Sequence, residues 1–123
     1  MDNKEKYLIL DVELFCANVL FSFGNTAEDL QKRVYETYPD WNLKLGKKEF
    51  DGIHIQRKQS SAFIVAVMFW PSTAYHYSVL QHELFHLTFA ILDRVGMKLS
   101  YDSEEAFAYL HSYITQKVYE YLW

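Results

Sequence analysis

Apolar and polar residues alternate along the first part of the chain, which is typical of a strand with one buried face. From Leu8 to Cys16 every second residue is apolar, and after a shift of one position near Ala17 and Asn18 the apolar face continues from Val19 to Phe23. A shift of this kind indicates a turn or a bulge. We therefore expect two strands that form a hairpin, the first of them reaching Cys16.

The pattern then changes to the period of a helix. Thr26 can cap this helix, because its hydroxyl can accept a hydrogen bond from a backbone N–H of the first turn. The apolar residues Leu30, Val34 and Tyr38 recur every four positions and are followed by Pro39. Proline cannot continue a helix, so we expect the first helix to end there.

Two further strands are expected after this helix. In the next segment, Ile53 and Ile55 alternate with His54 and Gln56, which indicates a half-buried strand. His54 lies on the polar side of that alternation, and we interpret it as a surface residue. Residues 62–70 are a nearly continuous apolar run rich in β-forming side chains, which is typical of a central strand.

A long second helix is predicted from about residue 74 to residue 95. It contains no Gly or Pro, and Gly96 is placed as a C-terminal cap. At 100° per residue its side chains form two stripes on opposite sides. One stripe is Leu80, Leu84, Leu87 and Ile91, and the other is Val79, His82, His86, Phe89 and Asp93. We expect both sides to be covered, one by the sheet and one by the next helix.

That third helix is predicted from Asp102 or Ser103 to about Tyr121. Its expected core positions are Phe107, Leu110, Ile114 and Val118. The predicted fold class is therefore α+β. It has a small, mostly antiparallel sheet of about four strands, with one helix between the strand pairs, followed by the long helix and an antiparallel third helix.

Composition adds limits on the class of protein. The chain has 123 residues, 50% of them hydrophobic and 23% charged, with four Gly and two Pro, which excludes a disordered or low-complexity chain. We interpret residues 1–123 as one domain, large enough to fold without disulfides. Twelve basic and sixteen acidic residues give a net charge of -4, which argues against a nucleic-acid partner. No apolar run is long enough to span a membrane, so we expect no membrane partner.

The expected compartment is the cytoplasm. Residues 1–6 are polar and mixed in charge, unlike a secretion signal. Cys16 is the single cysteine and cannot form an internal disulfide, which fits a reducing environment. Its apolar neighbours suggest a buried thiol. Nothing in the pattern decides the oligomeric state.

Residues 82–86 read His-Glu-Leu-Phe-His, the pattern HExxH, in the middle of the predicted second helix. Residues four apart share a helix face, so His82 and His86 can each direct a ring nitrogen at one ion about 2 Å away. Glu83 is turned by about 100° from His82, which places it as a base acting on water at the open position of the ion. The motif therefore predicts a zinc site.

The same three residues also allow a purely structural interpretation, in which they are hydrogen-bonded side chains of a buried helix. HExxH is short enough to arise by chance, so its context has to decide. Unpaired polar groups on a covered helix face cost about 1 to 3 kcal/mol each. A metal ion would satisfy all three groups, and we favour the zinc site.

Candidates for a third ligand occur where the third helix begins. An antiparallel return would bring its first turns beside His82 and His86, and Glu104 and Glu105 lie there. The structural alternative for Glu105 is a capping box with Asp102.

HExxH followed by a Glu on the next helix resembles the gluzincins, the thermolysin-like clan of zinc peptidases. In that clan the Glu is commonly followed three residues later by a small residue and four later by a polar one. Glu105 is followed by Ala108 and Tyr109 at those positions, whereas Glu104 would place Phe107 in the small position. The resemblance thus implies Glu105 as the third ligand, with Glu104 as the alternative. With Ser103 as the cap, Glu105 would be free for this role.

The resemblance covers about residues 74–112 in detail, and the rest of the chain only in architecture. Short phage- and prophage-encoded proteins of unknown role have a similar ending. The implied activity is zinc-dependent hydrolysis of peptide bonds, with Glu83 as general base and a peptide or protein as substrate. The oxyanion would also need a donor besides zinc, and the candidates by sequence are Tyr109, Tyr101, His76 and His111. Tyr109 is singled out as a catalytic residue only by its spacing of four positions from Glu105.

Residues 52–58 are our candidate for the sheet edge that would bind the substrate backbone. The competing hypothesis is a non-catalytic zinc-binding accessory or regulatory module that acts through protein–protein contacts of its exposed aromatic residues.

Overall fold

The computed structural model describes residues 6–45, 50–57 and 60–123. Within these ranges the chain forms four strands in one sheet, three α-helices and one short 3-10 helix. The elements follow the predicted order of strands, helix, strands, helix, helix. The predicted α+β class is therefore confirmed.

The strand order in the sheet is β1-β2-β4-β3. These strands are β1 (Tyr7–Val12), β2 (Ala17–Phe23), β3 (Gly52–Gln56) and β4 (Ala62–Val67). The pairs β1–β2 and β3–β4 are antiparallel, whereas the central pair β2–β4 is parallel. The sheet is thus mostly antiparallel, as expected, and β4 lies inside it with β3 at an edge.

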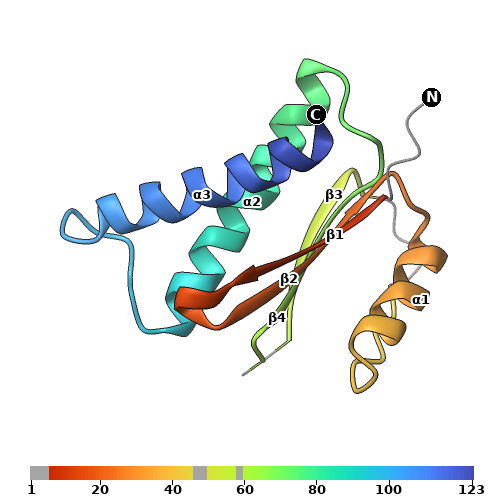
Figure 1. Cartoon of the computed structure of the whole chain (residues 1–123), viewed down its shortest axis with the longest axis horizontal. Helices are drawn as coiled ribbons and strands as arrows, with labels where there is room; N and C mark the ends of the chain where they lie inside the picture. Colours follow the sequence, from red (N-terminus) through yellow and green to blue (C-terminus); the bar gives the residue numbers. More distant parts are fainter. Residues whose placement is uncertain (1–5, 46–49, 58–59) are drawn as a thin grey trace.

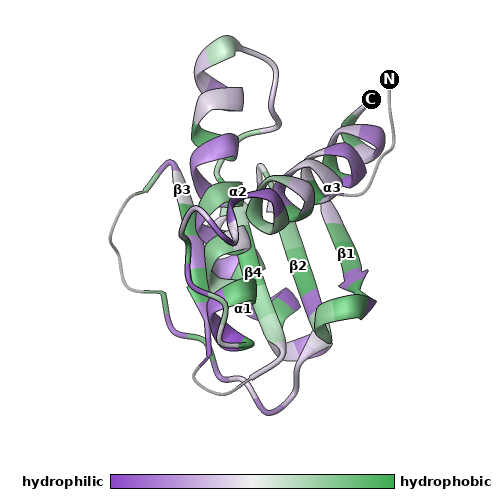
Figure 2. Ribbon diagram, turned by 90° about the vertical axis from the view of Figure 1, so that its left-hand side faces the viewer, coloured by the Kyte–Doolittle hydropathy of each residue, from purple (hydrophilic) through white to green (hydrophobic). Residues whose placement is uncertain are grey.

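The helices cover both faces of the sheet (Figure 1). The helix α1 (Ala27–Thr37) lies on one face, while α2 (Ala74–Arg94) and α3 (Glu104–Leu122) lie together on the other. Figure 2 shows hydrophobic ribbon on the inner strands β2 and β4 between these layers. Both strands are buried on both faces, which is why the β4 sequence is apolar throughout rather than alternating.

Two separate cores result from this arrangement. The larger core joins α2 and α3 to the side chains of β2 and β4 on their side of the sheet, including Phe21, Phe63 and Val65. The smaller core joins α1 to Leu20 and Ile64 on the opposite face. Within the described ranges, no helix combines the length and the apolar content needed to cross a bilayer.

The ends of the first two helices follow their local sequence signals. Thr26 caps α1 by accepting a hydrogen bond from the Asp29 N–H at 3.1 Å, as predicted. Thr73 caps α2 in the same way, accepting from the His76 N–H. Gly96 follows the end of α2 with a φ of +84°, a left-handed conformation that favours glycine.

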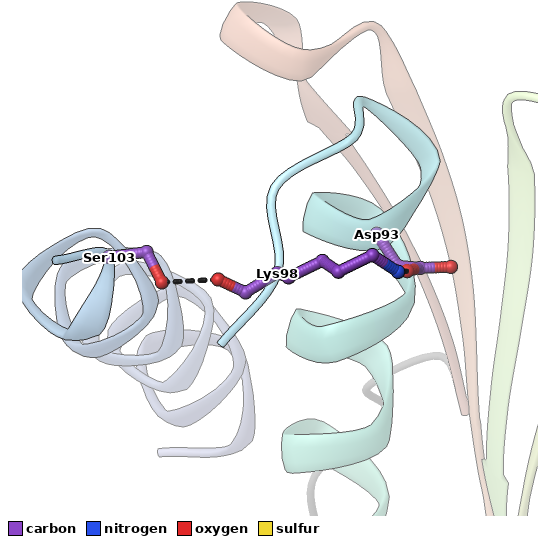
Figure 3. Close-up of polar contacts among 3 residues, drawn as sticks. All are labelled: Asp93, Lys98 and Ser103. Atoms are coloured by element: carbon purple, nitrogen blue, oxygen red, sulfur yellow. Dashed lines mark hydrogen bonds and ion pairs between the residues drawn. The ribbon is translucent and has the colours of Figure 1, made fainter. Parts of the chain in front are cut away.

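Ser103 is the N-cap residue of α3, but its hydroxyl does not cap the helix. Figure 3 shows that this hydroxyl donates to the carbonyl of Lys98 in the connection between α2 and α3. It also accepts a hydrogen bond from the Ser100 N–H at 2.9 Å. The Ser103 hydroxyl therefore stabilises the loop before α3 and leaves the first turn of the helix without a side-chain cap. Asp102 lies outside the helix.

The first hairpin is confirmed, but its turn comes earlier than the alternation suggested. The strand β1 ends at Val12, a 3-10 helix spans Glu13–Phe15, and Cys16 takes a left-handed φ of 51°. The expectation of a strand reaching Cys16 with a buried thiol is wrong, because Cys16 is exposed at the turn and Leu14 is 85% exposed. Leu14 and Cys16 continue the alternation of apolar residues in the sequence, but the turn places both of them outside the core.

The helices α2 and α3 share one face of the sheet, with α2 over β3 and β4 and α3 on the β1 side (Figure 2). The stripe of α2 that includes Leu80, Leu84 and Leu87 is fully buried, as predicted. The expectation that its second stripe is also covered is wrong, because α3 lies beside α2. His82 and His86 are exposed.

Candidate metal centre

Three polar side chains from the middle of α2 converge at the β3 edge of the sheet. The Nε2 atoms of His82 and His86 lie 3.1 Å apart. One ligand atom from each of His82, Glu83 and His86 lies within 4.8 Å of the others, so the three side chains could hold a metal ion. The predicted helix face for the two histidines is thus confirmed.

The spacing of the two nitrogens suits a common cation. Two nitrogens bound to one tetrahedral zinc at 2.0–2.1 Å would lie about 3.3 Å apart. The observed 3.1 Å is close to that value. Two imidazoles are also donors that zinc accepts, and the neighbouring carboxylate is placed for an ion or for its bound water. The residues present therefore fit a zinc ion.

Glu83 differs from the histidines in its surroundings. Its side chain is only 7% exposed, whereas His82 and His86 are both exposed. The structural argument that burial disfavours unpaired groups therefore applies to Glu83 alone. Burial raises the pKa of Glu83, and the nearby His82 and His86 lower it to a smaller extent.

Gly52 of β3 makes the room that Glu83 occupies. A Cβ atom on Gly52 would lie 3.0 Å from the Glu83 Cγ and 3.2 Å from its Oε2. It would also lie 2.9 Å from Cγ1 of Val79, one turn earlier on α2. A side chain at this position would displace Val79 and Glu83, so this glycine allows the close contact.

His54 of β3 lies beside this group. It pairs in register with Val65 of β4, so it faces α2. Its ring centroid is 6.3 Å from that of His86 and 6.5 Å from that of Phe63, with both pairs of rings nearly parallel. Its Nε2 is buried and has no hydrogen-bond partner. Burial, and secondly His86, lowers the pKa of His54 to about 4.

The interpretation of His54 as a surface residue is therefore wrong. Ile53 and Ile55 pack against the smaller core under α1, which turns His54 toward α2. Gly52 and His54 are the residues near the site that sequence reasoning missed. A signal for His54 was present, because helices predicted on both faces of the sheet would partly cover both sides of an edge strand.

The residues expected from α3 lie elsewhere. Glu104 and Glu105 are exposed in its first turn, and neither belongs to the group around His82. Phe107 contacts Phe89, and Tyr119 binds Gln81 with a hydrogen bond of 2.9 Å. The first turn of α3 thus lies near Phe89, and a late turn of α3 lies beside Gln81 of α2.

The proposed oxyanion donors are also dispersed. Tyr109 is 73% exposed and lines a hollow at the β1 side of the sheet, whereas the His82 group lies at the β3 edge. Tyr101 is 97% exposed in the loop before α3. His76 stacks on Phe69 and accepts a hydrogen bond from the Ser72 N–H. His111 is half-buried, and burial lowers its pKa.

Comparisons with known proteins add no assignment to this geometry. No protein-family model matches the chain, and no curated protein or solved structure shows significant similarity to it. The chemistry of the site therefore has to be inferred from its own residues.

Proposed function

We propose that this protein is a zinc-dependent metallopeptidase with a minimal zincin-like domain and its active site on α2. The observation that carries this proposal is the 3.1 Å approach of the His82 and His86 Nε2 atoms beside the buried carboxylate of Glu83. His82 and His86 would hold the metal ion.

A zinc ion held there would polarise a substrate carbonyl and lower the pKa of a water ligand toward about 7. Glu83 would accept a proton from the attacking water and then deliver it to the leaving amine. Its environment suits this role, because a carboxylate whose pKa is raised is a stronger base.

The substrate would bind as an extended peptide along β3. Among the described residues, β3 pairs with β4 alone, so its other edge can accept the backbone of an added strand. Gly52 and His54 of β3 adjoin Glu83 and His86, respectively. A peptide on this edge would therefore pass next to the proposed metal ion.

His82 and His86 supply two ligands, and a catalytic zinc ion needs a third ligand from the protein. The family resemblance implies Glu105, and that assignment stays a prediction, as does the role of Tyr109. Glu105 would have to approach His82 and His86 from the exposed first turn of α3.

The experiment that tests the proposal replaces Glu83 by Gln. The zinc-loaded variant should bind zinc as the parent does and lose peptide hydrolysis by about 100-fold or more, because general bases contribute about 10²- to 10⁴-fold. Glu28→Gln is the matched control, since Glu28 is exposed in the first turn of α1 on the other face of the sheet. Hydrolysis would be followed with a labelled unstructured protein, and zinc by metal analysis.

A Glu83→Gln protein that hydrolyses the substrate as fast as the parent would refute the peptidase. A Glu83→Gln protein that loses zinc would identify Glu83 as a ligand instead of a base.

The second candidate function is a zinc-stabilised binding module. It is favoured by a hollow of about 600 Å³ formed by residues 11–15 and the α3 side chains that include Tyr109 and Tyr113. Several of its apolar side chains are exposed, among them Leu14 at 85%. Biological activity that survives Glu83→Gln but is lost in Tyr109→Ala would support this function.

A further inference from the structure

We propose that His54 is the third protein ligand of the metal ion, so that β3 and α2 together form a three-histidine site with Glu83 beside it. This inference rests on the proposed metal site. It assigns the ligand to the sheet edge instead of to α3.

The register of the sheet is the first argument. His54 lies opposite Val65 in the antiparallel β3–β4 pair, and Val65 belongs to the core under α2 and α3. The side chain of His54 is therefore directed to the layer that contains His86. Its neighbours Ile53 and Ile55 occupy the opposite face.

The second argument is an unsatisfied atom. The Nε2 of His54 is buried and has no hydrogen-bond partner in the described structure. Buried polar atoms in folded proteins nearly always have a partner, and an exception requires an explanation. A neutral imidazole has one nitrogen with a free lone pair, which is the form that binds metal ions. A metal ion between His54 and His86 would supply the missing partner.

The third argument is distance. Two imidazole rings on one tetrahedral zinc have centroids about 5 Å apart, because each ring centre lies about 3 Å from the ion. The centroids of His82 and His86 are 4.7 Å apart, and those of His54 and His86 are 6.3 Å apart. Metal binding thus requires His54 to approach by about 1 Å and its ring, now 13° from parallel to that of His86, to turn until its Nε2 faces the ion. Both changes are within the reach of a side-chain adjustment on an edge strand.

Glu105 is the competing ligand. Its carboxylate lies in the exposed first turn of α3, where the macrodipole of the helix already stabilises its charge. Phe107, two residues later, contacts Phe89, one turn beyond His86 on α2. His54 is in ring contact with His86 itself.

Zinc affinity of three variants tests this assignment. His54→Phe keeps an aromatic ring against Phe63 and removes the nitrogens, so it is expected to fold. His76→Phe is the matched control, because His76 is also a histidine stacked on a phenylalanine but lies outside the group. Glu105→Gln tests the competing ligand.

We expect His54→Phe to weaken zinc binding by more than about 100-fold, beyond the loss caused by an outer-shell partner. His76→Phe and Glu105→Gln should bind zinc as the parent does. The opposite result, in which Glu105→Gln loses zinc and His54→Phe does not, overturns the proposal. The proposal is also overturned if the His54→Phe variant binds zinc normally but hydrolyses substrate slowly, because His54 would then act on the substrate and not on the metal ion.

NMR of the imidazole nitrogens provides a readout independent of activity. The chain has five histidines. Zinc should shift the ring nitrogens of His54, His82 and His86 and leave His76 and His111 unchanged. A zinc response confined to His82 and His86 overturns the proposal while the metal site stands. A parent protein that binds no zinc refutes the site itself, which is a different failure.

Discussion

His54 lies beside the rings of Phe63 and His86, where its burial makes protonation unfavourable. At the scale of single residues, this makes the stability of the metal-free protein depend on pH. The pKa of His54 is lowered from 6.5 to about 4 by burial and, secondly, by His86. Between these values the unfolded chain binds the proton and the folded chain does not.

The stability contributed by His54 is therefore fully present above pH 6.5 and is lost as the pH falls toward 4. The pKa difference corresponds to at most about 3 kcal/mol, and we expect about 1 to 2 kcal/mol because the half-buried ring is partly screened by water. Urea unfolding with a chelator at pH 7 and pH 4.5 measures this loss. His54→Phe should lose less free energy of unfolding than the parent over this range, and an equal loss in both proteins would contradict the prediction.

At the scale of elements, the position of α2 over β3 depends on a residue without a side chain. Gly52→Ala would place a Cβ 2.9 Å from Val79 and 3.0 Å from Glu83. We expect the unfolding free energy to fall by about 1 to 3 kcal/mol, as in other overpacked positions. Zinc affinity should fall as well, because β3 carries His54 and α2 carries His86. Denaturant unfolding and zinc titration measure the two effects.

Gly96→Ala is the control for this prediction. A Cβ at Gly96 meets no atom within 4 Å, but its φ of +84° is strained for alanine. The free energy of unfolding of this variant should fall, because alanine is strained at this positive φ, and its zinc affinity should not change. If both glycine variants bind zinc as the parent does, the contact of β3 with α2 does not matter for the site.

Most elements were predictable because their signals are local. Thr26, Gly96 and Pro39 lie at or next to the helix ends that they indicate, and a capping or turn signal acts within a few residues. The turn at Glu13–Phe15 was not, because the apolar alternation continued through it. The position of α3 on the sheet beside α2 also could not be predicted. Phe107 and Leu110 would be buried either there or in the expected position over the second stripe of α2.

At the scale of the whole molecule, metal binding should stabilise the fold. A ligand that binds only the folded state at 100 times its dissociation constant adds about 2.7 kcal/mol. For a domain of this size we expect zinc to raise the melting temperature by about 10 °C. His82→Ala should abolish most of this increase, and calorimetry with and without zinc measures it. An equal increase in His82→Ala would place the stabilising ion somewhere else.

The candidate site was only partly predictable. His82, Glu83 and His86 were found because they lie within one helical turn, and their spacing alone brings them together. His54 is 32 positions from His86 along the chain, and its contact depends on the sheet register and on the layer of α1 that takes Ile53 and Ile55.

The amino-acid sequence by itself determined the presence of the strands and helices, the ends of α1 and α2, and the pair of histidines on α2, because each depends on side chains a few positions apart. Only the tertiary structure decided which side of α2 stays open and which strand adjoins Glu83. It also decided that Glu104 and Glu105 do not join the group of His82, Glu83 and His86. These features depend on how large apolar surfaces from distant segments pack together, and the pattern of any one segment is compatible with several such packings.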